Sequence, residues 1–324
     1  MSNDTFRNDK TPGGQQYSSS SRFWAGNACI LVATMFWGIN VSFTKALIPH
    51  WMTSDSISAV RLIGGCIMFW TTSLFIKNSH IDHRDWRNLI LGGFVGLFGF
   101  IYLFVMSLRY ANPIDVSIIM TLPPMFVILM DILFRHYRPT TVEIAGVAIS
   151  FIGAIIVITA GGSGKTGSDN LLGDALAVAS TICYAFYLVI LERPTQKYRP
   201  VTMLRWVFLF AAIPAIALTV GIDQLAILHT DATEPWLEIS FILLCPTFIA
   251  YFLVQPAIRF IGSELVSIYQ YLLPVFATAS AVLMGLDKLK WVQIAAMVII
   301  VGGVALTNIG KCHNRHKKSN EITD

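Results

Sequence analysis

A glycine-rich stretch with a lysine and a threonine is the first pattern in this chain that could support phosphate chemistry. Residues 161–166 read GGSGKT and end like the loop G-x-x-x-x-G-K-[ST], whose backbone amides and lysine hold nucleotide phosphates. The first glycine of that loop would fall at position 159, which is Thr159. The apolar run 142–160 before it is too long for the strand that the motif requires. The stretch therefore predicts a linker, and no nucleotide cofactor is expected.

Cysteines and histidines are the next residues that could do chemistry. The chain has five cysteines, of which four lie inside apolar runs and one, Cys312, lies in the C-terminal tail. Their spacing, and that of His80 and His83, fits no tetrahedral zinc site. A membrane-embedded enzyme would need clustered Asp, His or Cys at membrane depth, and the sequence has no such cluster. We therefore expect no metal, no cofactor and no enzymatic activity.

Polar and aromatic side chains recur at helical spacing inside several apolar runs. Ser117 and Thr121 are one helical turn apart, and Ser267 and Tyr271 repeat the pattern. Polar atoms that face lipid are costly, so these faces are expected to point into the bundle. They either line a substrate cavity or form hydrogen bonds between helices. The predicted substrate-binding residues are Trp37, Asn40, Thr44, Ser117, Thr121, Tyr184, Tyr187, Tyr251, Gln255, Ser267 and Tyr271.

Three charged residues and two prolines are further candidates. Asp115 and Glu264 fall in the first turns of predicted helices, where a carboxylate complements the helix dipole; the alternative is proton coupling. Arg61 is the deepest intramembrane cation and the candidate for holding an anionic group of the substrate. Pro124 and Pro274 are predicted inside helices, where each removes a backbone hydrogen bond. They would act as hinges or as static bends.

The elements that must position these residues are long apolar helices. Hydrophobic residues make up 55% of the 324 residues and charged residues only 13%, against about 25% charged residues in soluble domains. Each apolar run is long enough to cross about 30 Å of hydrocarbon as a helix, and none alternates as a barrel strand would. We predict ten transmembrane helices over 24–48, 54–76, 86–108, 113–134, 141–160, 171–191, 201–221, 236–258, 263–285 and 290–309.

Lysine and arginine predict the orientation of these helices. If the N-terminus is cytoplasmic, sixteen of the 23 basic residues fall in cytoplasmic connections or tails and four on the opposite side. Such a bias is typical of the cytoplasmic side of membrane proteins. We therefore predict that both termini are cytoplasmic, with a disordered tail over residues 1–22 and a basic tail over 310–324 near anionic lipid headgroups.

The chain contains an internal duplication. At a shift of 150, LRYANPIDVSIIMTLPPMF over residues 108–126 aligns with IRFIGSELVSIYQYLLPVF over 258–276, and Pro124 meets Pro274. Each half holds five helices, and because five is odd, the second half enters the membrane from the opposite side. The predicted fold is an all-α integral membrane protein with two inverted-topology five-helix repeats. Its predicted parts are repeats over 23–160 and 171–309, joined by a linker over 161–170.

These features together resemble a known family. The first helix contains ATMFWGINVSFTKAL, the sixth contains DALAVASTICYAFYLVI, and both halves carry the stretch aligned above. In this order they are similar to the drug/metabolite transporter superfamily, EamA type, over about residues 24–309. The resemblance implies a ten-helix fold that moves solutes across the bacterial cytoplasmic membrane without ATP, with export as the direction.

We therefore expect a secondary transporter that exports small organic metabolites such as amino acids by alternating access through a cavity between the repeats. The aromatic and amide side chains of the proposed lining favour amphipathic solutes over bare ions. A proton gradient or the gradient of the solute itself would drive transport. The alternatives are a lipid-carrier flippase or a nucleotide-sugar carrier of the same fold, and a membrane-embedded non-transport protein. The expected partners are the substrate, protons as a candidate coupling ion, and lipids, but not nucleic acid.

Overall fold

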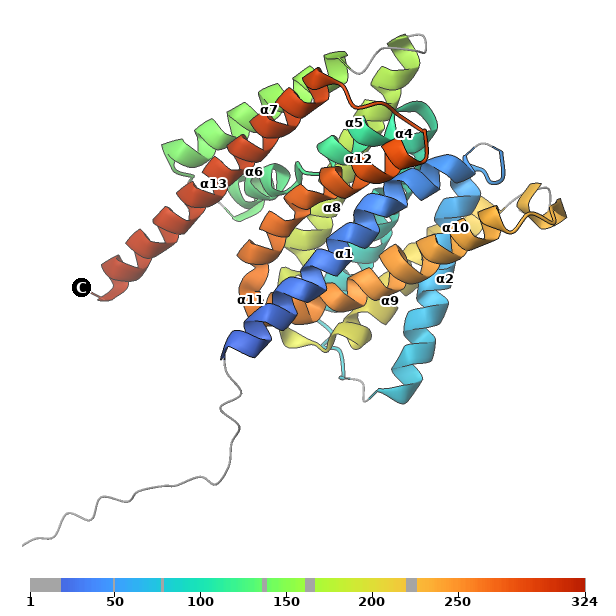
Figure 1. Cartoon of the computed structure of the whole chain (residues 1–324). Coiled ribbons are helices and arrows are strands. Elements are labelled where there is room, and N and C mark those ends of the chain that lie inside the picture. Colours follow the sequence, from blue (N-terminus) through green and yellow to red (C-terminus); the bar gives the residue numbers. More distant parts are fainter. Residues whose placement is uncertain are drawn as a thin grey trace, which may run out of the picture.

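The fold is all-helical, as the sequence predicts. The computed structural model describes residues 19–48, 50–76, 79–135, 139–160, 167–219 and 226–323, and every regular element in these ranges is a helix (Figure 1). Within them, seven helical stretches are long and apolar enough to span a membrane. Three shorter apolar helices, within 141–156, 270–283 and 291–307, bring this set to the predicted ten. The chain is therefore an integral membrane protein.

The first half of the chain contains seven α-helices and one π-helix, η1. Their bounds are α1 Ser19–Leu47, α2 Ser54–Phe75, α3 Trp86–Leu91, η1 Gly92–Leu97, α4 Phe98–Tyr110, α5 Pro113–Ile119, α6 Pro123–Arg135 and α7 Thr141–Ala160. α3, η1 and α4 form one continuous spanning segment. The side chain of Thr53 caps α2 by accepting a hydrogen bond from the backbone N–H of Ser56 at 3.2 Å, which satisfies one of the free amides at this helix start.

The second half repeats this order with helices of different length. Its bounds are α8 Gly167–Lys197, α9 Pro200–Ile216, η2 Ala217–Thr219, η4 Ala226–His229, α10 Glu234–Ile242, η5 Leu243–Ile249, α11 Ala250–Tyr269, η6 Gln270–Leu272, α12 Leu273–Leu283 and α13 Trp291–Thr323. Here η5 is a π-helix, whereas η2, η4 and η6 are short 3₁₀ helices. α13 extends past the predicted end at residue 309.

Several predicted helix boundaries differ from the structure, and two of the differences concern breaks in the helices. The predicted helix over 113–134 is broken at residues 120–122, between α5 and α6. The predicted connection after residue 258 is helical, and the corresponding break comes later, at η6. Pro124 and Pro274 lie in the first turns of α6 and α12, just after these breaks. A proline costs no hydrogen bond in a first turn, so the prolines favour a helix restart rather than a kink inside a continuous helix.

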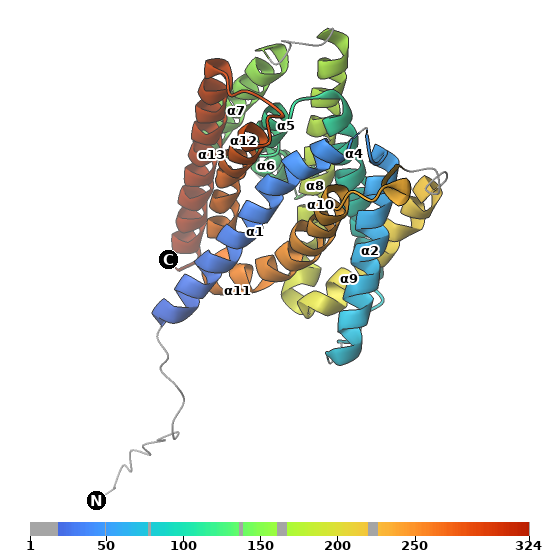
Figure 2. The ribbon, with the colours of Figure 1, turned by 45° about the vertical axis from the view of Figure 1, so that its right-hand side comes forward.

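The packing of the helices follows the internal duplication. At the shift of 150, α4 corresponds to α11 and α6 to α12, while α1 corresponds to α8. In the structure α1 packs on α11 and α12, and α8 packs on α4 and α6. α2 packs on α9, and α7 packs on α13, as both views show for the last pair (Figures 1 and 2). Exchanging the two halves thus leaves these main helix pairs unchanged, as expected for two inverted repeats.

Small residues allow α7 and α13 to pack at close range. A Cβ atom added to Gly303 would lie 2.5 Å from Ser150 Oγ and 2.6 Å from Ser150 N. A Cβ atom added to Gly146 would lie 2.6 Å from the backbone nitrogen of Thr307. Ser150 Oγ donates a hydrogen bond to the carbonyl of Gly146 at 3.0 Å. Small residues that let backbones approach are the usual means of helix association in lipid.

A polar cluster joins the two halves at one end of the bundle. Lys197, at the end of α8, lies 2.7 Å from Asp85 and 3.3 Å from Asp82, which precede α3. The hydroxyl of Tyr198 donates to Asp85 and accepts from the backbone N–H of Asp82 at 3.0 Å. The hydrogen bonds from Lys197 hold the pKa of both carboxyls below their ordinary value.

This cluster predicts a pH-dependent contribution to stability. A lowered carboxyl pKa stabilises the fold fully above the ordinary pKa near 4, and the contribution is lost as pH falls through the folded pKa. We expect wild-type protein in detergent to melt at a slightly higher temperature than Lys197→Met at pH 7, and the difference to fade below about pH 4. The exposed Lys288→Met is the control, with no such pH dependence. A difference that persists unchanged at pH 3 would contradict the assignment.

Candidate functional site

Two adjoining cavities lie between helices of the two repeats. Each offers about 50 Å³ of space for the centres of water molecules, enough for only a few waters. The first cavity is lined by Trp37, Asn40, Val41, Arg61, Phe100, Phe104, Met120, Tyr184, Tyr251, Gln270 and Leu273. The second is lined by Trp37, Tyr184, Tyr187, Leu188, Leu191, Thr195, Tyr251, Val254 and Gln255. Trp37, Tyr184 and Tyr251 belong to both linings and therefore stand where the two cavities meet.

The π-helix η5 positions two of the lining side chains. Trp37 donates its indole N–H to the carbonyl of Pro246 at 3.0 Å. Arg61 donates from Nε to Thr247 Oγ1 at 3.1 Å, and this hydroxyl donates in turn to the carbonyl of Ile242 at 2.8 Å. The five-residue step from Ile242 to Thr247 follows the π-helical repeat, and such segments often lie at functional sites. η1 occupies the matching place in the first repeat.

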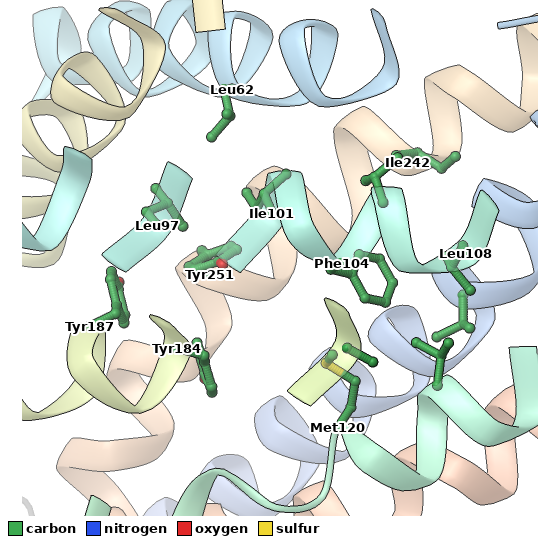
Figure 3. Packing of buried hydrophobic residues seen from close by; sticks show 14 of the residues in the cluster. Leu62, Leu97, Ile101, Phe104, Leu108, Met120, Tyr184, Tyr187, Ile242 and Tyr251 are labelled. Atoms are coloured by element: carbon green, nitrogen blue, oxygen red, sulfur yellow. The ribbon is translucent and has the colours of Figure 1, made fainter. Parts of the chain in front are cut away.

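Aromatic rings from both repeats form the walls. Trp37 meets Tyr251 edge to face, with ring centroids 5.8 Å apart. Tyr184 stacks on Tyr187 at 5.9 Å and contacts Phe100 at 4.7 Å. Figure 3 shows both tyrosines on α8, with Tyr251 of α11 nearby. Such rings present flat apolar faces together with hydroxyl groups that can bind a polar solute.

The two helix breaks contribute one lining residue each at equivalent positions. Met120 lies in the break between α5 and α6, and Gln270 begins η6. The shift of 150 places one over the other. Gln270 donates from Nε2 to the hydroxyl of Tyr184 at 3.4 Å. The breaks thus bring side chains of both repeats to the first cavity, although only one of these two is polar.

Two glycines let the lining helices approach each other. A Cβ atom on Gly96 of η1 would lie 2.9 Å from the Cβ of Tyr187. A Cβ atom on Gly38 of α1 would lie 2.6 Å from the Cβ of Phe276 and 2.9 Å from the carbonyl oxygen of Leu273. Both distances are shorter than side chains allow, so only glycine fits at these crossings without a shift. The approach places α8 and α12 beside the cavities.

Most of the predicted aromatic and amide residues come together here, as does Arg61. The predicted residues that line one or both cavities are Trp37, Asn40, Arg61, Tyr184, Tyr187, Tyr251 and Gln255. Their side chains come from α1, α2, α8 and α11, so both repeats contribute. The position of these residues fits the predicted lining, while their roles in binding stay predictions.

The predicted serine and threonine residues whose side chains are described lie outside both cavities. Ser117 and Thr121 donate to the carbonyls of Ile114 and Ile118, each at 2.7 Å, and the buried Thr44 donates to Asn40 at 3.3 Å. Serine and threonine in helices often bond back to their own backbone, so a hydroxyl stripe does not require a cavity. Tyr271 packs on the hydrophobic core and lines neither cavity, nor do Pro124 and Pro274. The side chains of Ser267 and Glu264 lie outside the described residues.

Asp115 lies apart from the cavities, beside a carboxylate that the sequence pattern does not single out. Asp115 is 2% exposed and accepts a hydrogen bond from Gln293 of α13 at 2.7 Å. Asp174 of α8 is 1% exposed and interacts electrostatically with Asp115. Within the described part of the chain, neither carboxylate oxygen of Asp174 has a hydrogen-bond partner. Two buried carboxylates from different repeats therefore face a common environment.

Sequence reasoning missed the apolar part of the lining, one amide and one hydroxyl residue. The missed residues are Val41, Phe100, Phe104, Met120, Leu188, Leu191, Thr195, Val254, Gln270 and Leu273. Apolar residues in an apolar helix carry no signal of which face meets a cavity. The duplication does carry a signal, because the shift of 150 places Met120 over Gln270 and Phe104 over Val254. In each of these two pairs, knowing that one residue lines a cavity would point to the other.

Comparison with known proteins identifies the relatives of the chain. The sequence matches the EamA-like transporter family over residues 24–159 and again over 171–309. It is 24% identical to the uncharacterized transporter YyaM of Bacillus subtilis, over 85% of this chain and 90% of that protein. It is 26% identical to an uncharacterized transporter of Archaeoglobus fulgidus, over 74% of this chain and 81% of that protein.

A solved structure also shares the fold. One crystal structure aligns with a TM-score of 0.58 at 18% sequence identity, over 90% of this chain and 98% of that chain. At this identity the likeness concerns the fold alone. The two family matches cover most of the chain, which is sufficient to assign the family.

Proposed function

Because this chain belongs to the EamA-like transporter family, we propose that it exports small organic metabolites, such as amino acids, as a secondary transporter. Transport proceeds by alternating access, in which the two inverted repeats rock against each other around a central site. The repeats extend over residues 23–160 and 171–309, with residues 161–170 as their joint. The protein lies in the bacterial cytoplasmic membrane with both termini in the cytoplasm, in keeping with its basic residues.

One observation supports this proposal most directly: the cavities lie between the repeats and take their walls from both. Trp37 of the first repeat meets Tyr251 of the second, and both belong to the two linings. A site at a repeat interface can face one side of the membrane and then the other when the repeats move. The present cavities are narrow, so a solute of amino-acid size requires these shared aromatic side chains to move apart.

Purified protein in liposomes tests the proposal. The liposomes are loaded in turn with labelled amino acids, amines and organic acids, and efflux is measured with and without a pH gradient. Empty liposomes and the family relative from Bacillus subtilis provide reference rates. We expect protein-dependent efflux of one compound class that saturates with concentration and does not need ATP. No protein-dependent flux of any compound in the panel would contradict the proposed function.

We further propose that Asp115 couples transport to protons. Carboxylates inside membrane proteins often belong to proton relays, and Asp115 is buried, as is Asp174 of the second repeat. We expect Asp115→Asn to abolish the effect of a pH gradient on transport while leaving solute exchange without a gradient within about twofold of wild type. Gln293→Glu, at the hydrogen-bond partner, serves as a second probe. Gradient-driven accumulation that survives in Asp115→Asn would exclude this residue.

A further inference from the structure

Arg61 is a buried cation of α2 that lines the first cavity. It is 3% exposed on α2, and among the described residues it forms no ion pair. Its Nη1 nitrogen is buried with no hydrogen-bond partner. A buried charge of this kind costs free energy unless it is paired and hydrogen-bonded. Such a group inside a membrane is by default a functional one.

The surroundings of Arg61 fix one edge of the guanidinium group and leave donors available. Thr247 accepts from Nε at 3.1 Å, and its own proton is committed to the carbonyl of Ile242. A lone pair of the hydroxyl oxygen therefore faces Arg61, which determines the direction of this hydrogen bond. The ring of Phe104 lies 5.9 Å from the guanidinium carbon and covers it only loosely. The arrangement orients Arg61 without neutralising it.

The cavity beside Arg61 has the composition of a site for a flat organic anion. Arg61 is the only cationic side chain in the described lining of either cavity. Phe100 and Phe104 supply flat apolar surfaces, and Asn40 and Gln270 supply amides. Guanidinium groups bind carboxylates through two parallel hydrogen bonds. One cation matches one carboxylate, whereas a phosphate dianion would leave charge uncompensated.

The other intramembrane cations are held outside this site. Lys45 Nζ donates to the backbone carbonyls of Leu108 and Ala111 and lines neither cavity. Arg205 lies over the rings of Trp70 and Trp206, at 5.1 and 5.4 Å from their centroids, and also lies outside both linings. These contacts hold Lys45 and Arg205 away from the cavities, whereas Arg61 lines the first one.

We infer that Arg61 binds the carboxylate of the transported solute, and that a flat apolar group is attached to this carboxylate. That the bound solute is also transported rests on the proposed function, but its binding can be measured without transport. Thr247 is a positioning residue, since it acts through Arg61. The same carboxylate chemistry could come from an amino acid or from an acid without an amino group. In the amino acid, the amides of Asn40 and Gln270 would accept hydrogen bonds from the ammonium group.

Four probes that share a phenyl ring on a three-carbon chain distinguish a carboxylate from an amine and an alcohol. They are L-phenylalanine, 3-phenylpropionate, 3-phenylpropylamine and 3-phenylpropanol, titrated by calorimetry into purified protein in lipid nanodiscs. We expect wild-type protein to bind at least one of the two carboxylates about 10- to 100-fold more tightly than the amine and the alcohol, as charge-assisted hydrogen bonds allow. Tighter binding of phenylalanine identifies an amino acid as the solute class, and tighter binding of phenylpropionate identifies an acid without an amino group.

Variants of Arg61 and a matched arginine complete the test. Arg61→Gln should remove the preference for the carboxylates, Arg61→Lys should retain part of it, and Arg205→Gln should leave it unchanged. Thr247→Val should weaken carboxylate binding without changing amine binding, and it provides a second test if Arg61→Gln does not fold. Equal affinities for the carboxylates, amine and alcohol in wild type, or an unchanged preference in Arg61→Gln, would overturn the inference.

The same variants keep the two proposals distinguishable. If wild-type protein and Arg61→Gln export a solute at equal rates in liposomes, the proposed function is supported and the role of Arg61 is contradicted. If carboxylate binding depends on Arg61 but no bound solute crosses the membrane, the binding site is supported and the transport function is contradicted. Loss of both export and carboxylate binding in Arg61→Gln, with unchanged melting temperature, supports both.

Discussion

Replacing Gly303 with leucine is expected to lower the stability of the protein strongly. The first atom of the new side chain would lie 2.5 Å from Ser150 Oγ and 2.6 Å from Ser150 N. Backbone cannot move aside as a flexible side chain can, so α13 must separate from α7. Overpacking of this kind costs about 3 kcal/mol, which lowers the melting temperature by roughly 5–10 °C.

The neighbouring residue provides a matched control. A Cβ atom on Gly302 would meet nothing within 4 Å, so Gly302→Leu adds the same side chain one position away without a clash. Both variants are purified in detergent, and their melting temperatures are compared with wild type by the fluorescence of a thiol-reactive dye. Equal melting temperatures for the two leucine variants would contradict the close α7–α13 packing seen in Figure 2.

The ten spans and the duplication could be read from the sequence because both depend on many residues at once. An apolar run of about 20 residues has no other stable form in lipid than a helix. The alignment at a shift of 150 extends over a whole helix. Because each half of the chain has an odd number of spans, the second half must be inverted relative to the first. Errors at single positions therefore do not change these predictions, and the structure has the same helix order.

The helix breaks are harder to predict because they depend on local competition between helix and turn. The apolar pattern predicts Pro124 and Pro274 inside helices, yet each lies in the first turn of a new helix. Periodicity continues across both breaks, so the pattern gives no sign of them. A proline at a helix start and a proline in a kinked helix have the same sequence signature.

Aromatic and amide residues of the predicted lining lie mostly at the cavities, whereas its described serine and threonine residues do not, for a physical reason. A tyrosine or tryptophan cannot satisfy its polar atom within its own helix turn, so it must reach another element, as Trp37 reaches Pro246. Ser117 and Thr121 satisfy theirs locally. The π-helix η5 orients Arg61 and Trp37, and Pro246 is its main mark in the sequence.

Trp37→Ala is expected to have the largest effect on transport among substitutions that remove no charge. Trp37 makes both of its described polar and aromatic contacts with the opposite repeat, through the carbonyl of Pro246 and the ring of Tyr251. A hydrogen bond and an aromatic pair are together worth about 1–3 kcal/mol. Losing them shifts an equilibrium between two states of the repeats by about 5- to 150-fold.

Under the proposed alternating access, this shift would be visible as a change in rate. If the contact forms in one state and breaks in the other, weakening it slows the cycle by unbalancing the two states. We expect efflux from liposomes to fall about tenfold or more in Trp37→Ala, and less in Trp37→Phe, which keeps the ring and loses only the hydrogen bond. Trp291→Ala, at a side chain that is 85% exposed, should transport at the wild-type rate. Undiminished efflux by folded Trp37→Ala would mean that the contact between the repeats at this residue takes no part in the transport cycle.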